Sequence, residues 1–209
     1  MKGLLFITHQ TGKYTYLQSV ELALQGGCRQ IQLRMKGSTV EEVEKTAVQA
    51  KALCDKYRAD LYVNDHVEVC LKVGAKGVHL GKADMSPLVA RSILGDTFVI
   101  GGTANTFDDI RHLSEQGVDY IGLGPFRFTT TKERLSPVLR IDGYREIMRL
   151  CRENEIKAPV LAVGGVTVTD VPALMQTGVA GVAVSTGILL ADDPVGETRR
   201  FLLHTDDTD

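Results

Sequence analysis

Gln116-Gly117-Val118-Asp119 leads directly into the apolar run 120–124, and the same arrangement occurs at four places in the chain. In each copy a glycine follows an amphipathic stretch, and a strand-length hydrophobic run starts within a few residues. A glycine just after the last helical turn is typical of a left-handed helix cap. The pattern therefore predicts one helix-to-strand joint that is used repeatedly. The other copies are Gln25-Gly26-Gly27-Cys28, Val73-Gly74-Ala75-Lys76 and Thr177-Gly178-Val179-Ala180.

Short apolar runs alternate with amphipathic stretches on both sides of these joints. Most of the runs are continuously hydrophobic, as expected for parallel strands that are buried on both faces. One amphipathic stretch, residues 40–57, has apolar side chains at helical spacing and predicts a helix. The expected strands are residues 4–8, 30–35, 61–64, 77–80, 98–101, 120–124, 160–163 and 181–185.

Eight expected strands and a repeated joint favour an α/β fold, a single (β/α)8 TIM barrel with short loops over residues 1–209. The last residues, about 204–209, are expected to form a disordered acidic tail. A doubly wound open sheet is the alternative, but it usually has fewer strands, and the first strand-to-helix turn lacks a GxGxxG fingerprint. In a barrel, polar residues at the carboxyl ends of the strands form the active site.

The composition excludes several classes of protein. The 209 residues are 44% hydrophobic and 24% charged, with a net charge of −2, which is unlike a fibrous or disordered chain. Near-neutral charge predicts no nucleic-acid or membrane partner, and no apolar run approaches the roughly 18 residues of a membrane span. The first residues lack the features of a secretory signal, so we expect a cytoplasmic protein. The four cysteines form no CxxC pair, which favours buried free thiols.

Alternate residues after the second expected strand are polar. With a side-chain period of two, Gln32, Arg34 and Lys36 fall on one face, toward the barrel interior. A buried arginine without an anion is costly, so this face predicts an anion site. The alternative for Lys36 is a solvated residue at the rim.

Two carboxylates follow neighbouring strands. Asp65 comes directly after the third expected strand, and Asp84 follows the fourth. Two carboxylates, with water and a substrate phosphate, are the usual ligands of Mg²⁺. Both residues also precede expected helices, where aspartate is a common N-cap. Metal binding and helix capping both remain open at this point.

Further strand ends carry groups suited to phosphate. Thr129, Thr130, Thr131 and Lys132 follow the sixth strand, and hydroxyls with an ammonium group suit a phosphorylated ligand. Glycines after the seventh strand and small hydroxyls after the eighth form the usual phosphate site of a barrel. His79, inside an expected strand, is interpreted as a hydrogen-bonded barrel histidine. No Ser-His-Asp order or HExxH motif is present, so covalent hydrolysis lacks support.

Six motifs, in this order and spacing, resemble the thiamine phosphate synthase family: QLRMK, VNDH, GVHLGKAD, GPFRFTTTK, VGGV and GVAVST. The resemblance covers about residues 4–193. It implies the (β/α)8 fold and a transferase that uses Mg²⁺. The implied reaction joins hydroxymethylpyrimidine diphosphate to thiazole phosphate and releases pyrophosphate.

The resemblance also implies a role for each candidate residue. Asp65 and Asp84 would bind Mg²⁺. The residues implied for the pyrimidine diphosphate are Gln32, Arg34, Lys36, Asn64, Thr103 and Lys132, of which Arg34, Lys36, Thr103 and Lys132 would be catalytic. Those implied for the thiazole phosphate are Thr129, Thr130, Thr131, Gly165, Val184 and Ser185.

The chain departs from the family pattern at several positions. His9-Gln10 stands where Asp-Arg is usual, Lys82 where glutamine is common, and Thr103 replaces a serine. A related thiazole tautomerase carries an acid/base histidine at the position of Asn105, so that activity is the first alternative. A non-catalytic phosphate-binding regulator is the second, and the intact carboxylates argue against both. Small molecules are the expected partners, and a homodimer is compatible with the sequence.

Overall fold

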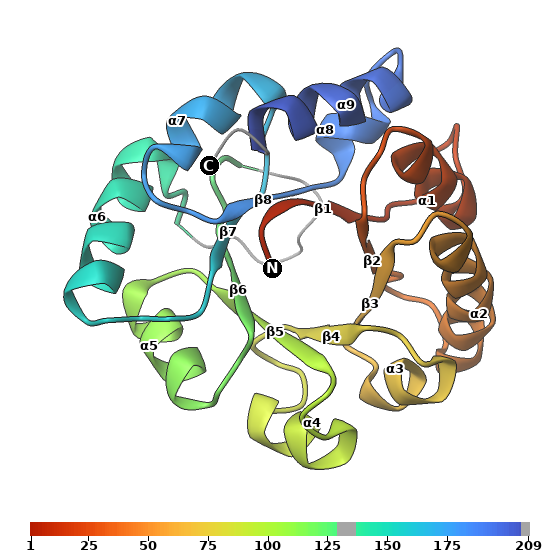
Figure 1. Ribbon diagram of the computed structural model, residues 1–209, viewed down its shortest axis with the longest axis horizontal. Helices are drawn as coiled ribbons and strands as arrows, with labels where there is room; N and C mark the ends of the chain where they lie inside the picture. Colours follow the sequence, from red (N-terminus) through yellow and green to blue (C-terminus); the bar gives the residue numbers. More distant parts are fainter. Residues whose placement is uncertain (129–136, 206–209) are drawn as a thin grey trace.

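The computed structural model describes residues 1–128 and 137–205. Within these ranges eight strands pair side by side in chain order, all of them parallel, and β1 pairs with β8 to close the sheet (Figure 1). The barrel prediction is confirmed, and the open-sheet alternative is wrong. The strands are β1 (Gly3–Ile7), β2 (Gln30–Leu33), β3 (Asp60–Asn64), β4 (Gly77–Leu80), β5 (Val99–Ala104), β6 (Tyr120–Leu123), β7 (Val160–Val163) and β8 (Gly181–Val184).

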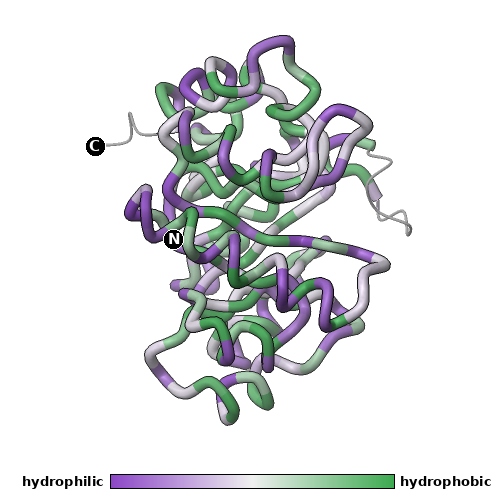
Figure 2. Tube along the Cα trace, turned by 90° about the vertical axis from the view of Figure 1, so that its right-hand side faces the viewer, coloured by the Kyte–Doolittle hydropathy of each residue, from purple (hydrophilic) through white to green (hydrophobic). Residues whose placement is uncertain are grey.

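Helices surround the barrel, and in the side view of Figure 2 hydrophobic and hydrophilic residues alternate along them. Capping boxes start three of these helices, because Thr15, Thr39 and Thr106 each accept a hydrogen bond from the backbone N–H three residues on. The helices are α1 (Tyr16–Gln25), α2 (Val40–Lys56), α3 (Val67–Val73), α4 (Pro87–Leu94), α5 (Phe107–Glu115), α6 (Arg140–Glu153), the 3₁₀ helix η1 (Val168–Asp170), α7 (Val171–Met175), α8 (Thr186–Leu189) and α9 (Pro194–Thr205).

The last helix bears on the expected tail. α9 extends through Thr205, two residues into the stretch 204–209 that was expected to be disordered. Residues 206–209 lie outside the described residues. Across the part of the chain that is described, no helix is both long and apolar enough to cross a membrane.

The repeated joint has the predicted conformation. Gly27, Gly74, Gly117 and Gly178 have φ angles of 103°, 64°, 69° and 99°, a region that favours glycine. In the first copy the left-handed residue is the second glycine, because Gly26 ends α1 at φ −71°. The residue after each turn is buried and begins the approach to the next strand; these residues are Cys28, Ala75, Val118 and Val179.

Two strand ends differ from the prediction. β2 ends at Leu33, two residues before the expected end, because the side chain of Thr8 takes over the pairing. The Thr8 hydroxyl accepts from the Arg34 N–H at 2.9 Å and donates to the Arg34 carbonyl at 3.2 Å. β5 continues to Ala104, beyond the glycines that suggested its end, since Gly101–Ala104 remain paired with β6.

The barrel has two apolar regions. The larger core lies between the strands and the helices, and includes Phe6, Ile31 and Phe201. A smaller cluster fills the barrel interior and consists of Leu5, Tyr62, Tyr120, Leu161 and Ala183. The interior cluster forms the inner end of the cavity described next.

Candidate active site

A cavity of about 510 Å³ opens at the carboxyl ends of the strands. One wall is apolar and comes from the first and the last two strands; it includes Leu5, Ile7, Leu161 and Val163. The opposite wall is polar and comes from β2 to β6. The polar lining consists of Gln32, Arg34, Lys36, Asn64, Asp65, His79, Lys82, Asp84, Thr103, Asn105 and Tyr120.

A smaller compartment of about 70 Å³ adjoins this cavity. Its lining is mostly backbone and small side chains, from the turn after β7 and the turn after β8. Arg34 lines both compartments, and His9 lines only the smaller one. The candidate phosphate residues found here are Gly165, Val184 and Ser185.

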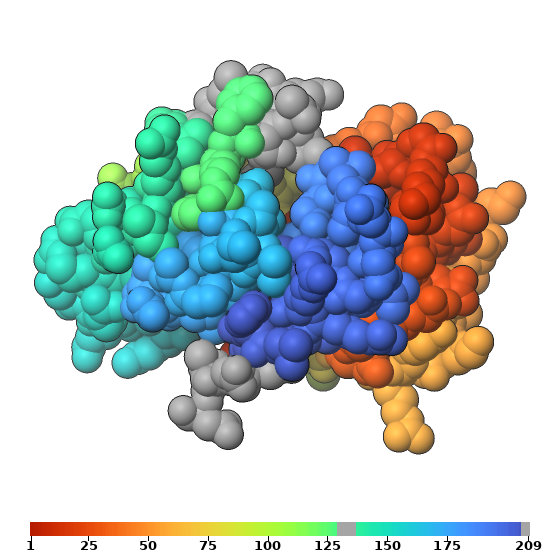
Figure 3. All heavy atoms as spheres, turned by 90° about the horizontal axis from the view of Figure 1, so that it is seen from above, coloured from red at the N-terminus to blue at the C-terminus, as the bar shows by residue number. Residues whose placement is uncertain are grey.

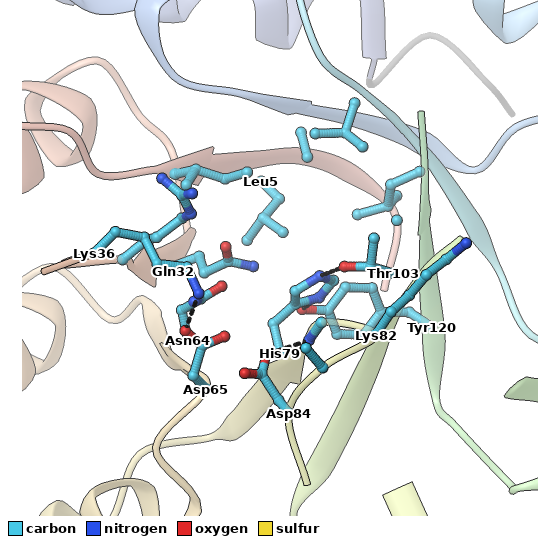
Figure 4. Close-up of a pocket in the computed structure, with 18 of the residues that line it drawn as sticks. Leu5, Gln32, Lys36, Asn64, Asp65, His79, Lys82, Asp84, Thr103 and Tyr120 are labelled. Carbon is cyan, nitrogen blue, oxygen red and sulfur yellow. Dashed lines mark hydrogen bonds and ion pairs between the residues drawn. The ribbon is translucent and has the colours of Figure 1, made fainter. Parts of the chain in front are cut away.

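Asp65 and Asp84 face each other across the larger cavity (Figure 4). Neither caps a helix: His66 is the N-cap of α3, and the Ser86 hydroxyl caps α4. The Asp84 carboxylate instead accepts a hydrogen bond from the Gly81 N–H at 2.7 Å. The capping interpretation is therefore wrong for both residues, and the carboxylates are available to the cavity.

The charges around Asp65 fit a divalent cation. Burial raises the pKa of Asp65, and the neighbouring carboxyl of Asp84 raises it further, while an ion pair with Lys36 opposes both effects. Two carboxylates this close repel each other unless a cation or a shared proton lies between them. In residues 1–128 and 137–205, no third His, Cys, Asp or Glu completes a metal cluster. Further ligands would thus come from water or a substrate phosphate, as is usual for Mg²⁺.

Three cations border the same cavity: Arg34, Lys36 and Lys82. Lys82 forms an ion pair with Asp109 on α5 at 2.6 Å, so its ammonium group is held at the side of the cavity. Although burial alone would raise the pKa of Asp109, hydrogen bonds from Lys82 and from the backbone of Asn105 lower it below the ordinary value. The lysine that replaces the usual glutamine is therefore anchored by a partner on the next helix.

The segment after β6 is fixed beside the smaller compartment. The N–H groups of Phe126 and Arg127 each donate at 2.9 Å to Val163 and Gly164. The Arg127 guanidinium also forms an ion pair with Asp170 and donates to the Gly165 carbonyl at 3.1 Å. These bonds bring the chain up to Phe128 against the turn after β7. Thr129, Thr130, Thr131 and Lys132 lie outside the described residues.

The structure brings the remaining predicted residues together. Gln32, Arg34, Lys36, Asn64, Asp65, Asp84 and Thr103 all line the larger cavity. Arg34 and Lys36 do so from the loop after β2, since the strand itself ends at Leu33. The interpretation of His79 as a hydrogen-bonded barrel residue is confirmed, with ring nitrogens 3.0 Å from the Tyr120 hydroxyl and 2.9 Å from the Thr103 hydroxyl.

Sequence reasoning missed Tyr120, which lines the cavity although it lies at the start of β6. Its ring lies against Gly101 of the neighbouring strand, where any Cβ would overlap it. Glycine inside a strand often marks a close approach of this kind. The pair Gly101-Gly102 was therefore the available signal, although it does not say which side chain fills the space.

Comparison with known proteins agrees with this geometry. The family model described as thiamine monophosphate synthase matches residues 4–188. The chain belongs to this family. A thiamine-phosphate synthase of Phocaeicola vulgatus is 54% identical over 197 residues, which cover 94% of this chain and 95% of the relative. One from Bacteroides fragilis is 54% identical over 202 residues, covering 97% and 99%.

A solved structure extends the likeness to three dimensions. The thiamine phosphate pyrophosphorylase of Pyrococcus furiosus superimposes with a TM-score of 0.86 at 30% identity, covering 98% of this chain and 96% of that one. This member of the thiamine monophosphate synthase family thus shares its fold with a protein of markedly different sequence. Tertiary packing around the strand ends, rather than overall sequence, is the common element.

Proposed function

We propose that the protein is a thiamine phosphate synthase, which joins hydroxymethylpyrimidine diphosphate to thiazole phosphate and releases pyrophosphate. The observation that carries this proposal is the pair of adjoining compartments that meet at Arg34. The larger combines two carboxylates with cations, and the smaller is lined by backbone and small side chains. Two phosphorylated substrates of different size, which must react with each other, fit such an arrangement.

The larger cavity would take the pyrimidine diphosphate. A flat heteroaromatic ring suits a space with one apolar wall and one polar wall. Gln32 and Asn64 are both almost fully buried and supply amide groups to the ring edge. Arg34 and Lys36 border the same space and supply positive charge to the diphosphate.

Asp65 and Asp84 would hold Mg²⁺ together with the diphosphate oxygens. When bound, the ion neutralises negative charge on the leaving group. Lys36 and Arg34 act on that same charge, which grows as the bond from the pyrimidine methylene carbon to the diphosphate oxygen breaks. The carbon then accepts the lone pair of the thiazole nitrogen, so no protein nucleophile is required.

The smaller compartment would take the phosphate of the thiazole. Its volume of about 70 Å³ is the size of one phosphate group rather than of a ring. Backbone N–H groups near Gly165 and the hydroxyl of Ser185 are suitable donors to an anion. Thr129, Thr130, Thr131 and Lys132 remain proposed contacts, and the bonds of Arg127 lead the chain toward this compartment.

Asn105 supports a synthase over a tautomerase. Its side-chain N–H donates to the Gly124 carbonyl at 2.5 Å, so it joins the ends of β5 and β6. An amide also lacks a group that titrates near neutral pH and cannot serve as the acid/base histidine of the tautomerase.

The test is product formation. Purified protein, Mg²⁺ and both substrates should give thiamine phosphate and pyrophosphate by mass spectrometry, and chelation of Mg²⁺ should stop the reaction until Mg²⁺ is restored. Thiazole phosphate supplied alone should remain unchanged. Isomerisation of that compound without coupling would instead establish a tautomerase, and binding without turnover would establish a regulator.

A further inference from the structure

Four side chains form a continuous hydrogen-bonded series inside the barrel. The ring of His79 lies between two hydroxyls, with Nδ1 3.0 Å from the Tyr120 oxygen and Nε2 2.9 Å from the Thr103 oxygen. The Gln32 side chain also hydrogen-bonds Tyr120. The series Gln32–Tyr120–His79–Thr103 connects β2, β6, β4 and β5, and all four residues line the larger cavity (Figure 4).

Each hydrogen in this series can point in only two directions. A neutral imidazole donates from one nitrogen and accepts at the other, and a phenol has a single proton to donate. If Tyr120 donates to Nδ1, then Nε2 carries the ring proton and donates to Thr103, and the Thr103 proton is left for the cavity. If the series runs the other way, Thr103 donates to Nε2 and offers the cavity only lone pairs.

An anion in the cavity selects between the two directions. Diphosphate oxygens only accept hydrogen bonds, so Thr103 must donate to them. That requirement places the ring proton on Nε2 of His79 and makes Tyr120 donate to Nδ1. The Tyr120 oxygen then accepts from the Gln32 amide N–H, which turns the Gln32 carbonyl oxygen away from Tyr120. A carbonyl oxygen free in this way suits an exocyclic amino group on the same substrate.

We propose that His79 and Tyr120 are positioning residues that couple Thr103 to Gln32, so that binding of the diphosphate fixes the orientation of the amide that recognises the pyrimidine. This inference rests on the proposed function for the roles of Thr103 and Gln32. Neither His79 nor Tyr120 needs to touch the reacting atoms. Burial supports a fixed arrangement, because Tyr120 is fully buried and the Gln32 side chain is 2% exposed.

The first experiment observes the tautomer directly and does not depend on turnover. Protein labelled with ¹⁵N-histidine is titrated with Mg²⁺ and inorganic pyrophosphate, and the two ring nitrogens of His79 are followed by long-range ¹⁵N–¹H NMR. We expect Nε2 to be protonated and Nδ1 to be unprotonated in the bound state. In Tyr120→Phe this preference should be lost, because Nδ1 no longer has a donor. A bound state with Nδ1 protonated, or with both nitrogens protonated, would overturn the proposal.

The second experiment is a double-mutant cycle on kcat/KM for the pyrimidine diphosphate. Tyr120→Phe should lower this value about tenfold, as expected for one buried hydrogen bond, and should leave KM for thiazole phosphate within about twofold. Tyr62→Phe is the matched control, since it removes a hydroxyl from the same interior cluster but outside the series. Thr103→Ser should retain most activity, and Thr103→Val should lose it.

The cycle separates coupling from packing. In the Thr103→Val background, Tyr120→Phe should have little further effect, because the series no longer reaches the cavity. Additive losses would show that Tyr120 only supports the barrel, and would overturn the proposal. Wild-type protein that fails to make thiamine phosphate, yet shows the expected tautomer with pyrophosphate, would refute the proposed function and leave the coupling intact.

Discussion

Asp65 has a left-handed backbone, with φ at 69°, at the point where β3 ends. This conformation turns its carboxylate toward Asp84 and Lys36 instead of letting the residue cap α3. Non-glycine residues in this region are uncommon, and aspartate and asparagine tolerate it best. The position therefore demands a particular side-chain chemistry on two grounds, the backbone and the site.

Asn substitutions at the carboxylates should separate function from folding. Asp65→Asn keeps a side chain that accepts the left-handed backbone, and Asp84→Asn keeps an acceptor for the Gly81 N–H. We expect each change to lower kcat at least about 100-fold, because it removes charge from a proposed cation site. Thermal denaturation should show a Tm close to that of the wild type. Asp142→Asn, at an exposed position on α6, is the matched control.

Full activity of both variants, or retained activity in EDTA, would contradict the metal role. Loss of folding in both variants without a separate effect on kcat would assign the carboxylates a structural role only.

The two anion compartments should respond differently to truncation. Lys36→Met is expected to lower both kcat and kcat/KM, because the charge on the leaving group grows in the transition state. Ser185→Ala should mainly raise KM for thiazole phosphate, about fivefold for one lost hydrogen bond of ~1 kcal/mol, since that phosphate keeps its charge throughout. Steady-state kinetics with each substrate varied in turn measures both effects.

The reverse pattern would exchange the two assignments. If Ser185→Ala weakened only the pyrimidine diphosphate, the smaller compartment would belong to that substrate. Lys36 also pairs with Asp65, so Lys36→Arg, which keeps the charge, serves to separate lost charge from lost packing.

At the scale of elements, the turn after β7 is held in place by the segment after β6. Gly165 has φ at 69°, and a Cβ there would lie 2.9 Å from Cβ of Arg127. Gly164 beside it also has a left-handed backbone. The two elements are thus in contact through backbone, and little space separates them.

Gly165→Ala should therefore disturb the smaller compartment. We expect a destabilisation of about 2 kcal/mol or more, from the unfavourable φ and from the clash together, and a raised KM for thiazole phosphate. Gly74→Ala is the matched control, because Gly74 has a similar φ of 64° and nothing within 4 Å of its Cβ position. Chemical denaturation of both variants measures the difference. Equal losses of stability would show that the clash is relieved by movement of Arg127.

The ion pair between Arg127 and Asp170 should make this part of the barrel sensitive to acid. Burial alone would raise the pKa of Asp170, but hydrogen bonds from Arg127 and Thr167 outweigh burial and lower the pKa below its ordinary value. The ionised carboxylate therefore stabilises the fold above the ordinary pKa of about 4, and this contribution disappears as the pH falls through the lower native value.

Asp170→Asn should consequently reduce the free energy of unfolding by about 1 kcal/mol at pH 7, and by less near pH 3. Urea denaturation of wild type and variant across this range gives the difference at each pH. A difference that grew on acidification would contradict the assigned direction.

How far sequence predicts these elements depends on the range of the contacts involved. Parallel strand ends meet at one end of a barrel, so the meeting of Asp65 with Asp84 followed from local pattern alone. The end of β2 did not, because it depends on Thr8, which is 26 residues away in sequence. The choice between capping and metal binding also needed the structure, since it depends on one φ angle at Asp65. Tyr120 could not be placed because the register of β5 with β6 sets its neighbour.

For the molecule as a whole, the four cysteines report on global opening. All four are buried as free thiols. Burial raises the pKa of Cys28 to about 11 and those of Cys54 and Cys70 to about 12, so little thiolate forms at pH 8. Cys151 is 4% exposed, whereas the other three have no measurable exposure.

Ellman's reagent should therefore react with the native protein at least about 100-fold more slowly than with protein unfolded in guanidinium chloride, because reaction requires opening. Cys151 should react first, which mass spectrometry of partly labelled protein can verify. Rapid reaction of Cys28, Cys54 or Cys70 under native conditions would show that the packing between barrel and helices opens locally.

The pairing of β1 with β8 also governs how the chain is made. This seam joins Gly3 to Gly181 and Phe6 to Val184, and beside it α9 packs against α1 (Figure 3). A ribosome adding 5–20 residues per second needs roughly 10–35 s to travel from the first partner to the second. Throughout that interval one edge of β1 has no strand beside it, and unpaired edges associate with one another. The yield of folded protein in a cell therefore depends on the arrival time of β8 and on the crowding of nascent chains, in addition to the stability of the finished barrel.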